Sequence, residues 1–151
     1  MTSHSKIKFL IRSGTQKDVS ECANIDTDAF HIFTTERRHE HLAERANANQ
    51  LLVAVIDRTI VGYATFDANW FKSTFLKLVV VAEGFQRRGI ASALIREIAA
   101  SYCPSGRLFS STEDNNEASL AMHQHLGFRH SGYIDNLPQP GREIFLFLKV
   151  S

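Results

Sequence analysis

The sequence predicts a single α/β domain over residues 1–151, with a mixed, twisted sheet flanked by helices. The chain has 151 residues, which is close to the commonest size of one domain. Short apolar runs that suit strands alternate with segments of helical periodicity. Some neighbouring strand segments are joined by tight turns and others by helices, and this mixture indicates both antiparallel and parallel strands in one sheet.

The first part of the chain predicts a strand followed by two helices. Ile7 to Arg12 is a short apolar-rich run typical of a strand, and Gly14 interrupts it. Thr15 to Asp18 has the form of a capping box, which starts a helix that we expect to reach about Phe30. Arg37 to Asn47 is rich in Ala, Glu and His and predicts the second helix.

The middle of the chain predicts a β-hairpin, a third strand and a helix. Leu51 to Ile56 and Ile60 to Phe66 are strand patterns that a short turn joins. Phe75 to Val81 is a further apolar run, rich in β-branched residues. Gly89 to Tyr102 repeats apolar residues at helical spacing, and the Pro-Ser-Gly sequence at 104–106 ends that helix.

The last part of the chain predicts strands around one further helix. Leu108 to Ser111 suits a strand, and Ala118 to Leu126 suits a helix that Gly127 closes. Phe128 to Tyr133 and Glu143 to Val150 are the final strands. The predicted order is therefore β-α-α-β-β-β-α-β-α-β-β.

Composition and charge argue against several classes of protein. The formal net charge of +1 gives no global basic field for nucleic acid or an anionic membrane. No apolar stretch approaches the roughly 18 residues that span a bilayer, and Met1 to Lys6 lacks the apolar core of a signal peptide. Cys22 and Cys103 lack metal-type spacing, so we expect buried or half-buried thiols and no metal site. The expectation is a soluble cytoplasmic protein.

A strand-turn-helix segment at residues 79–91 is the strongest functional signal. Its helix begins at small residues, where unpaired backbone N–H groups and the positive end of the helix dipole favour a bound phosphate. Gly89 and Ala91 leave room for phosphate oxygens, and Arg87 and Arg88 add positive charge. An ordinary turn with solvated arginines is equally consistent on physical grounds, since the segment is neither a Walker loop nor a dinucleotide fingerprint.

Residues 86–91, Gln-Arg-Arg-Gly-Ile-Ala, resemble the (Gln/Arg)-x-x-Gly-x-(Gly/Ala) signature of the GNAT acetyltransferases. Residues 116–128 resemble the family's Asn-x-x-Ala-x-x-Leu-Tyr-x-x-x-Gly-Phe stretch, with Ser119 and Met122 at the Ala and Leu positions. Residues 11–18 resemble the opening strand and helix of the family, and residues 144–147 resemble its last strand. The resemblance therefore covers essentially the whole chain.

The resemblance implies a GNAT fold and direct transfer of an acetyl group from acetyl-CoA to a primary amine. It implies that the backbones of Val79 and Val81 pair with the pantetheine arm, and that one N–H there polarises the acetyl carbonyl. Asn116 is implied to contact the cofactor from the other side, and a homodimer is one expected state because members of the family often dimerise. The residues implied to hold the pyrophosphate are Gln86, Arg87, Arg88, Gly89, Ile90 and Ala91.

Departures from the family's pattern bear on the acid–base chemistry. His123 replaces the Tyr that serves many members as general acid for the leaving thiolate, and Lys77 stands where many members carry a carboxylate. We take His123 as the candidate acid; the alternative is a ring that only packs on its helix. Glu113, followed by Asp114, comes after a predicted strand and is the candidate base, and the alternative there is a solvated loop that caps the next helix.

Three functions are compatible with the sequence. The first, which we favour, is acetylation of a small-molecule amine, because the His-Gln-x-Leu-Gly-Phe form of residues 123–128 is similar to some aminoglycoside acetyltransferases. The second is acetylation of protein N-termini or lysines, and the third is a regulatory domain that binds acetyl-CoA without catalysis. The family's acceptor cleft corresponds to Phe30, Phe33, Trp70 and Phe71, although aromatic residues more often serve packing.

Overall fold

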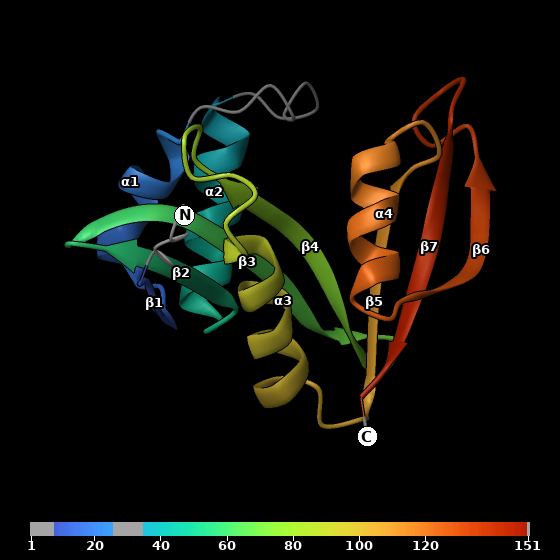
Figure 1. Cartoon of the computed structure of the whole chain (residues 1–151), viewed down its shortest axis with the longest axis horizontal. Coiled ribbons are helices and arrows are strands. Elements are labelled where there is room, and N and C mark those ends of the chain that lie inside the picture. The colour runs from blue at the N-terminus through green and yellow to red at the C-terminus, as the bar shows by residue number, and fades with distance from the viewer. Residues whose placement is uncertain (1–7, 26–34, 151) are drawn as a thin grey trace, which may run out of the picture. The chain divides into compact units, whose positions relative to one another are not determined.

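The computed structural model describes residues 8–25 and 35–150 of the chain (Figure 1). Within these residues a seven-stranded sheet has the strand order β1-β2-β3-β4-β5-β7-β6. The strands are β1 (Leu10–Ser13), β2 (Leu51–Ile56), β3 (Thr59–Trp70), β4 (Ser73–Val81), β5 (Arg107–Glu113), β6 (Arg129–Asp135) and β7 (Arg142–Lys149). The helices are the 3-10 turn η1 (Gln16–Asp18), α1 (Val19–Ala23), α2 (Thr35–Asn47), α3 (Ile90–Ser101) and α4 (Glu117–His125).

The strand pairing confirms the predicted mixed sheet. β2 pairs with β1 and β3 in antiparallel fashion, and β7 pairs antiparallel with β5 and β6. β4 runs parallel to β5, with Thr74 beside Leu108 and Phe75 beside Phe109. This parallel pair is the one that needs a helical crossover, and α3 supplies it.

The chain divides into two compact units. The first consists of Met1–Thr65 with Leu78–Ile95, and the second of Phe66–Lys77 with Arg96–Ser151. Three elements, β3, β4 and α3, run from one unit into the other. That the whole chain is a single domain stays a prediction.

The core of the first unit lies between its helices and its strands. Leu42 of α2 and Val53 of β2 are completely buried, and burial of one such side chain contributes about 1.5–3 kcal/mol. Cys22 is also buried, as predicted for that thiol. The residues of this core are Val19, Cys22, Ala23, Ile25, Leu42, Ala46, Leu51, Val53, Ile60, Tyr63 and Val80.

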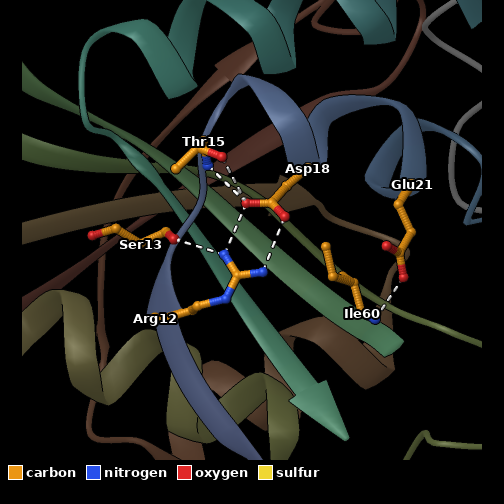
Figure 2. Close-up of polar contacts among 6 residues, drawn as sticks. All are labelled: Arg12, Ser13, Thr15, Asp18, Glu21 and Ile60. Atoms are coloured by element: carbon orange, nitrogen blue, oxygen red, sulfur yellow. Dashed lines mark hydrogen bonds and ion pairs between the residues drawn. The ribbon is translucent and has the colours of Figure 1, made fainter. Parts of the chain in front are cut away.

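The predicted capping box is present, and an ion pair ties it to β1 (Figure 2). The backbone N–H of Thr15 donates to Oδ2 of Asp18 at 2.8 Å. Arg12 donates from Nη1 and Nη2 to the two oxygens of the same carboxylate, at 2.8 and 3.0 Å. The hydrogen bonds from Arg12 lower the pKa of Asp18 to about 2. Close by, the backbone N–H of Ile60 donates to the carboxylate of Glu21 at 2.7 Å, which joins α1 to β3.

In the second unit, α4 covers one face of the strands (Figure 1). Leu108, Ser110 and Thr112 of β5 are buried, and the Ser110 side chain bonds to His123 of α4. The intervening residues of β5 are only half-buried. Because side chains alternate along a strand, those intervening residues lie on the face turned away from α4.

Several boundaries differ from the predicted ones. The first helix ends at Ala23 instead of reaching about Phe30; Asn24 is its C-cap, and the N–H of Ile25 donates to the carbonyl of Cys22, a 3-10-type bond that closes the last turn. Ile7 and the 26–34 segment lie outside the described residues. β3 continues to Trp70 and β5 to Glu113, so both strands are longer than their apolar runs. Cross-strand pairing extends a strand into polar residues that local propensity does not favour.

Candidate functional site

The segment between β4 and α3 has the geometry of an anion-binding turn. Residues 82–89 form a loop in which Gly84, Arg87 and Gly89 all have positive φ angles, of 89°, 62° and 83°. The N–H of Ala93 donates to the carbonyl of Gly89 at 3.0 Å, and this bond opens α3. The N–H groups that precede Ala93 in the first turn have no carbonyl one turn earlier to receive them.

The start of α3 is open on the outside and anchored on the inside. Ile90 is buried and fixes the first turn against the unit's core. A Cβ placed on Gly89 would have no atom within 4 Å, so the space over this position is free. An anion there would meet free N–H groups and the positive end of the helix dipole. Arg87 and Arg88 are exposed beside it. That a phosphate binds at this turn stays a prediction.

Val79 and Val81 of β4, which are predicted to pair with the pantetheine arm, direct their backbone N–H and C=O groups away from β3. The N–H of Ala82 donates to the carbonyl of Val61 on β3 at 2.8 Å. Successive residues of a strand direct their N–H and C=O groups to opposite edges, so those of Val79 and Val81 point away from β3. The side-chain amide of Gln86 donates to the carbonyl of Val81 at 3.3 Å. Gln86 thus ties the turn back to the end of the strand.

The residues predicted for the cofactor turn lie in the first unit, whereas Glu113, Asn116 and His123 lie in the second. Asn116 is the N-cap of α4, and its side-chain oxygen accepts from the N–H of Ser119 at 3.1 Å. Its implied contact with the cofactor stays a prediction. Trp70 is half-buried at the end of β3, and Phe71 is 83% exposed in the following turn. Phe30 and Phe33 lie outside the described residues.

His123 is buried, with 3% of its surface exposed, and both ring nitrogens are bonded. Nδ1 lies 2.7 Å from the backbone carbonyl of Ser119, and Nε2 lies 2.8 Å from Oγ of Ser110. A carbonyl only accepts, so Nδ1 carries the hydrogen and the neutral ring accepts the Ser110 hydroxyl hydrogen at Nε2. Burial lowers the pKa of His123 below its ordinary value. The ring is therefore mainly neutral at pH 7.

Glu113 lies within β5, where it faces a carboxylate that the sequence reasoning missed. Glu113 and Glu143 are direct cross-strand partners on β5 and β7. Burial raises the pKa of Glu143, and the charge of Glu113 raises it further, although a hydrogen bond from Ser111 opposes the shift. Like charges placed directly opposite on a sheet are destabilising. Only the register of two strands distant in sequence reveals this pair.

An aromatic cavity is the second feature that the sequence did not predict as a whole. It is open to solvent along much of its extent, and its volume is about 280 Å³. Trp70 is one of its walls, and the centroid of its ring lies 5.2 Å from that of Phe109 and 6.4 Å from that of Phe145. The lining residues are Trp70, Phe109, Ser131, Gly132, Tyr133, Ile134 and Phe145.

Other classes of site receive no support within residues 8–25 and 35–150. No three His, Cys, Asp or Glu side chains are grouped there so as to hold a metal ion. No helix among the same residues has the length and apolar character needed to cross a membrane. Burial raises the pKa of Cys22 to about 12 and also raises that of Cys103. A high pKa keeps a thiol protonated and a poor nucleophile.

A family model described as the acetyltransferase (GNAT) family matches residues 19–128. Curated protein sequences gave no significant match. Among solved structures, a GNAT-family acetyltransferase from Bacillus cereus is 28% identical with a TM-score of 0.84, and the alignment covers 95% of this chain and 99% of that one.

More distant structures share the fold. The ribosomal-protein-S18-alanine N-acetyltransferase from Escherichia coli is 18% identical with a TM-score of 0.78, and 95% of each chain is covered. The Salmonella typhimurium protein yncA, solved with its cofactor acetyl-CoA, is 19% identical with a TM-score of 0.76, and again 95% of each chain is covered.

Proposed function

This chain belongs to the GNAT family of acetyltransferases, and we propose that it moves an acetyl group from acetyl-CoA directly to the primary amine of a small molecule. The family sets the reaction class, which is acetyl-CoA-dependent N-acetyl transfer. The choice of a small acceptor is our own. It is supported by the aromatic cavity, whose apolar walls offer contact to the body of a small amine.

The observation that carries acetyl-CoA binding is the open start of α3. The space over Gly89 is free, the first-turn N–H groups lack helical acceptors, and Arg87 and Arg88 stand beside them. These features fit a pyrophosphate, and we assign Gln86 through Ala91 to hold it. Val79 and Val81 would pair with the pantetheine arm through the backbone groups that point away from β3. Asn116 would add a contact from α4.

Acetyl-CoA supplies an activated thioester when bound. Residues of the chain must remove the proton from the acceptor amine. An alkyl amine has a pKa near about 10.4, so it must lose a proton before it attacks. We propose Glu113 as the group that takes this proton, since it is a half-buried carboxylate beside a second one. A carboxylate base of this kind needs no metal.

We propose His123 as the hydrogen-bond donor to the leaving sulfur, the role of the Tyr that it replaces. The Nδ1 hydrogen is donated to Ser119 and Nε2 accepts from Ser110, so the ring must exchange one of these bonds before it can donate elsewhere. In the alternative role His123 only packs between α4 and β5, and both of its hydrogen bonds stay in place.

The decisive experiment measures thiol release from acetyl-CoA with a panel of amines. The panel contains 2-phenylethylamine, glucosamine, kanamycin and a short peptide with a free N-terminus. Release with a small amine, and a product heavier by one acetyl group in mass spectrometry, is the expected result. Release with the peptide alone would establish protein acetylation instead. Binding of acetyl-CoA by calorimetry without release for any acceptor would favour a regulatory domain.

A further inference from the structure

The aromatic cavity opens on the face of the second unit's strands that is turned away from α4. Ser110 bonds to His123 of α4, so Phe109 on the same strand points to the opposite face. Phe75 is the neighbour of Phe109 on β4, and Phe147 is its neighbour on β7. Directly paired residues share a face, so the aromatic side chains of three strands gather on the side that lacks α4.

The carboxylate pair lies on this same face. Glu113 follows Phe109 by an even number of residues on β5, and Glu143 precedes Phe145 by two on β7. The cavity residue Ile134 of β6 is the cross-strand partner of Glu143. Glu143 is therefore flanked by Ile134 across the sheet and by Phe145 along its own strand, both of which line the cavity.

The pairing of two carboxylates at one cross-strand position needs an explanation. Like charges directly opposite destabilise a sheet, typically by some tenths of a kcal/mol up to about 1 kcal/mol. Two cations share this face by the same alternation: Lys77 follows Phe75 by two residues on β4, and Arg107, whose Nε donates to Ser73, precedes Phe109 by two on β5. Arg142 alternates with Glu143 along β7; its Nε donates to Asp135 at 2.7 Å, and its guanidinium stacks 3.9 Å over the ring of Tyr133, which itself lines the cavity. A cationic ligand between Glu113 and Glu143 would offset their repulsion.

We infer that the cavity takes the ring-bearing, apolar body of a primary amine whose nitrogen is bound by Glu113 and Glu143. The inference deepens the proposed function and rests on it, because it names the acceptor's chemical class. Apolar binding sites for small molecules are typically lined by aromatic side chains with a few polar groups that fix orientation. An aromatic ring over the face or edge of Trp70 gains about 0.5–1.5 kcal/mol beyond its buried area.

The amine end has matching electrostatics. Two carboxylates can accept the hydrogens of one ammonium, and hydrogen bonds between charged groups are the strong ones. Burial and the neighbouring Glu113 raise the pKa of Glu143, so the two carboxylates together accept a proton more readily than an isolated one, and Glu113 takes the amine's proton with Glu143 beside it. A polar polyamine such as an aminoglycoside would satisfy the carboxylates but leave the aromatic walls in contact with its hydroxyl groups.

Trp70 provides a direct test, because it is the single tryptophan of the chain and it lines the cavity. Tryptophan fluorescence is titrated with 2-phenylethylamine in the absence of acetyl-CoA. Two further probes are 2-phenylethanol, which lacks the charge, and glucosamine, which lacks the apolar body. The expected result is saturable change with 2-phenylethylamine and at least tenfold weaker binding of each of the other two.

Matched variants separate the carboxylate from general effects. Glu143→Gln keeps the size of the side chain and should weaken 2-phenylethylamine binding about tenfold, the worth of one charged hydrogen bond. Glu40→Gln removes an exposed carboxylate on α2 and should leave the affinity unchanged. Thermal unfolding should show a midpoint for Glu143→Gln equal to or above that of the parent protein, because the substitution removes repulsion.

The outcomes distinguish this inference from the proposed function. Saturable quenching of Trp70 fluorescence by 2-phenylethylamine without acetyl transfer would support the amine site and contradict the proposed function. Acetyl transfer to glucosamine with no response to 2-phenylethylamine would keep the function and overturn the site. Equal affinities for 2-phenylethylamine and 2-phenylethanol would overturn the role of the carboxylates. A peptide with N-terminal Phe that binds more tightly than 2-phenylethylamine would overturn the small-amine class.

Discussion

The hydroxyl of Ser110 lies 2.8 Å from Nε2 of His123 and donates its hydrogen to that nitrogen. This direction follows from the other side of the ring, where Nδ1 donates to the carbonyl of Ser119 at 2.7 Å. The ring is thus held in one tautomer by α4 and by β5. A histidine that replaces a Tyr acid has here a fixed orientation and a neutral resting state.

His123→Ala should cut the turnover rate while acetyl-CoA affinity stays nearly intact, and His123→Tyr should restore part of the rate. General acid assistance is worth about 10²–10⁴-fold, which sets the expected loss. The measurement is steady-state kinetics combined with calorimetry. Since Ala also leaves the Ser110 hydroxyl without its acceptor, a folding check by thermal unfolding accompanies each variant.

The pH profile separates two forms of the acid that we propose at His123. The pKa of His123 is lowered by burial, so an obligatory imidazolium would lose activity as pH rises through a value below 6.5. If the neutral ring is the donor, titration of His123 causes no loss of activity as pH rises. We expect the neutral case, with kcat constant or rising between pH 6.5 and 9. Full activity of the Ala variant throughout that range would remove His123 from the mechanism.

Local patterns were sufficient to predict the fold. Leu51–Ile56 is a strand with the same bounds in the sequence and in the structure, because a continuous apolar run is also a buried strand. The turn at residues 82–89 was predictable for a similar reason, since its glycines, arginines and following helix are adjacent in sequence. The elongation of β3 to Trp70 was not, because its polar residues are held by pairing with neighbours.

Local sequence pattern could not predict the residues that we propose for binding the acceptor. Glu143 is an ordinary acid at the start of a predicted strand until the register places it opposite Glu113. The sequence also did not single out Ser110, because its hydrogen bond to His123 exists only where α4 packs against β5. A one-residue change of register would move every one of these side chains to the other face, and sequence alone does not specify register.

Asp18→Asn should lower the free energy of unfolding by about 1–2 kcal/mol, because it breaks a bidentate pair and leaves the N–H of Thr15 with a weaker acceptor. The matched control is Asp135→Asn, at the other Arg–Asp pair. The Asp18 side chain is 11% exposed and that of Asp135 is 58% exposed, so the control should change stability by less than about 0.5 kcal/mol. Urea unfolding of the three proteins makes the comparison.

The same pair makes a prediction about acid stability. The pKa of Asp18 is about 2 in the folded protein against an ordinary value of 3.8. The carboxylate therefore contributes its stability above about pH 4, and the contribution is lost as pH falls toward 2. The difference between the parent protein and Asp18→Asn should shrink over that window. A constant difference down to pH 2 would show that the ion pair does not act through protonation.

Arg87→Ala and Arg88→Ala should each weaken acetyl-CoA binding by about two- to fivefold, and more strongly at low salt. Both side chains are exposed, and single exposed charges are worth under about 1 kcal/mol. Salt screens such charges, so the effect should fall between 20 and 300 mM salt. Arg96→Ala, at an exposed position further along α3, is the control and should have little effect. Complete loss of binding from either single change would indicate one fixed contact instead of a shared field.

Gly89→Leu should weaken acetyl-CoA binding at least tenfold without unfolding the protein. The space over Gly89 is free of protein atoms within 4 Å, so a side chain fits there but occupies the place that we propose for the pyrophosphate. The φ angle of 83° also disfavours any L side chain, typically by about 1–2 kcal/mol, and this strain must be separated from the loss of ligand space.

Gly84→Leu supplies that separation. Gly84 has a φ angle of 89°, and a Cβ placed on it also has no atom within 4 Å, so the substitution carries the same backbone strain. It lies in the same loop but outside the segment assigned to the pyrophosphate. Calorimetry with acetyl-CoA should therefore give near-parental affinity for Gly84→Leu and a tenfold or greater loss for Gly89→Leu. If both variants lose acetyl-CoA affinity equally, loop strain is the cause. If both keep the parental affinity, the pyrophosphate binds elsewhere.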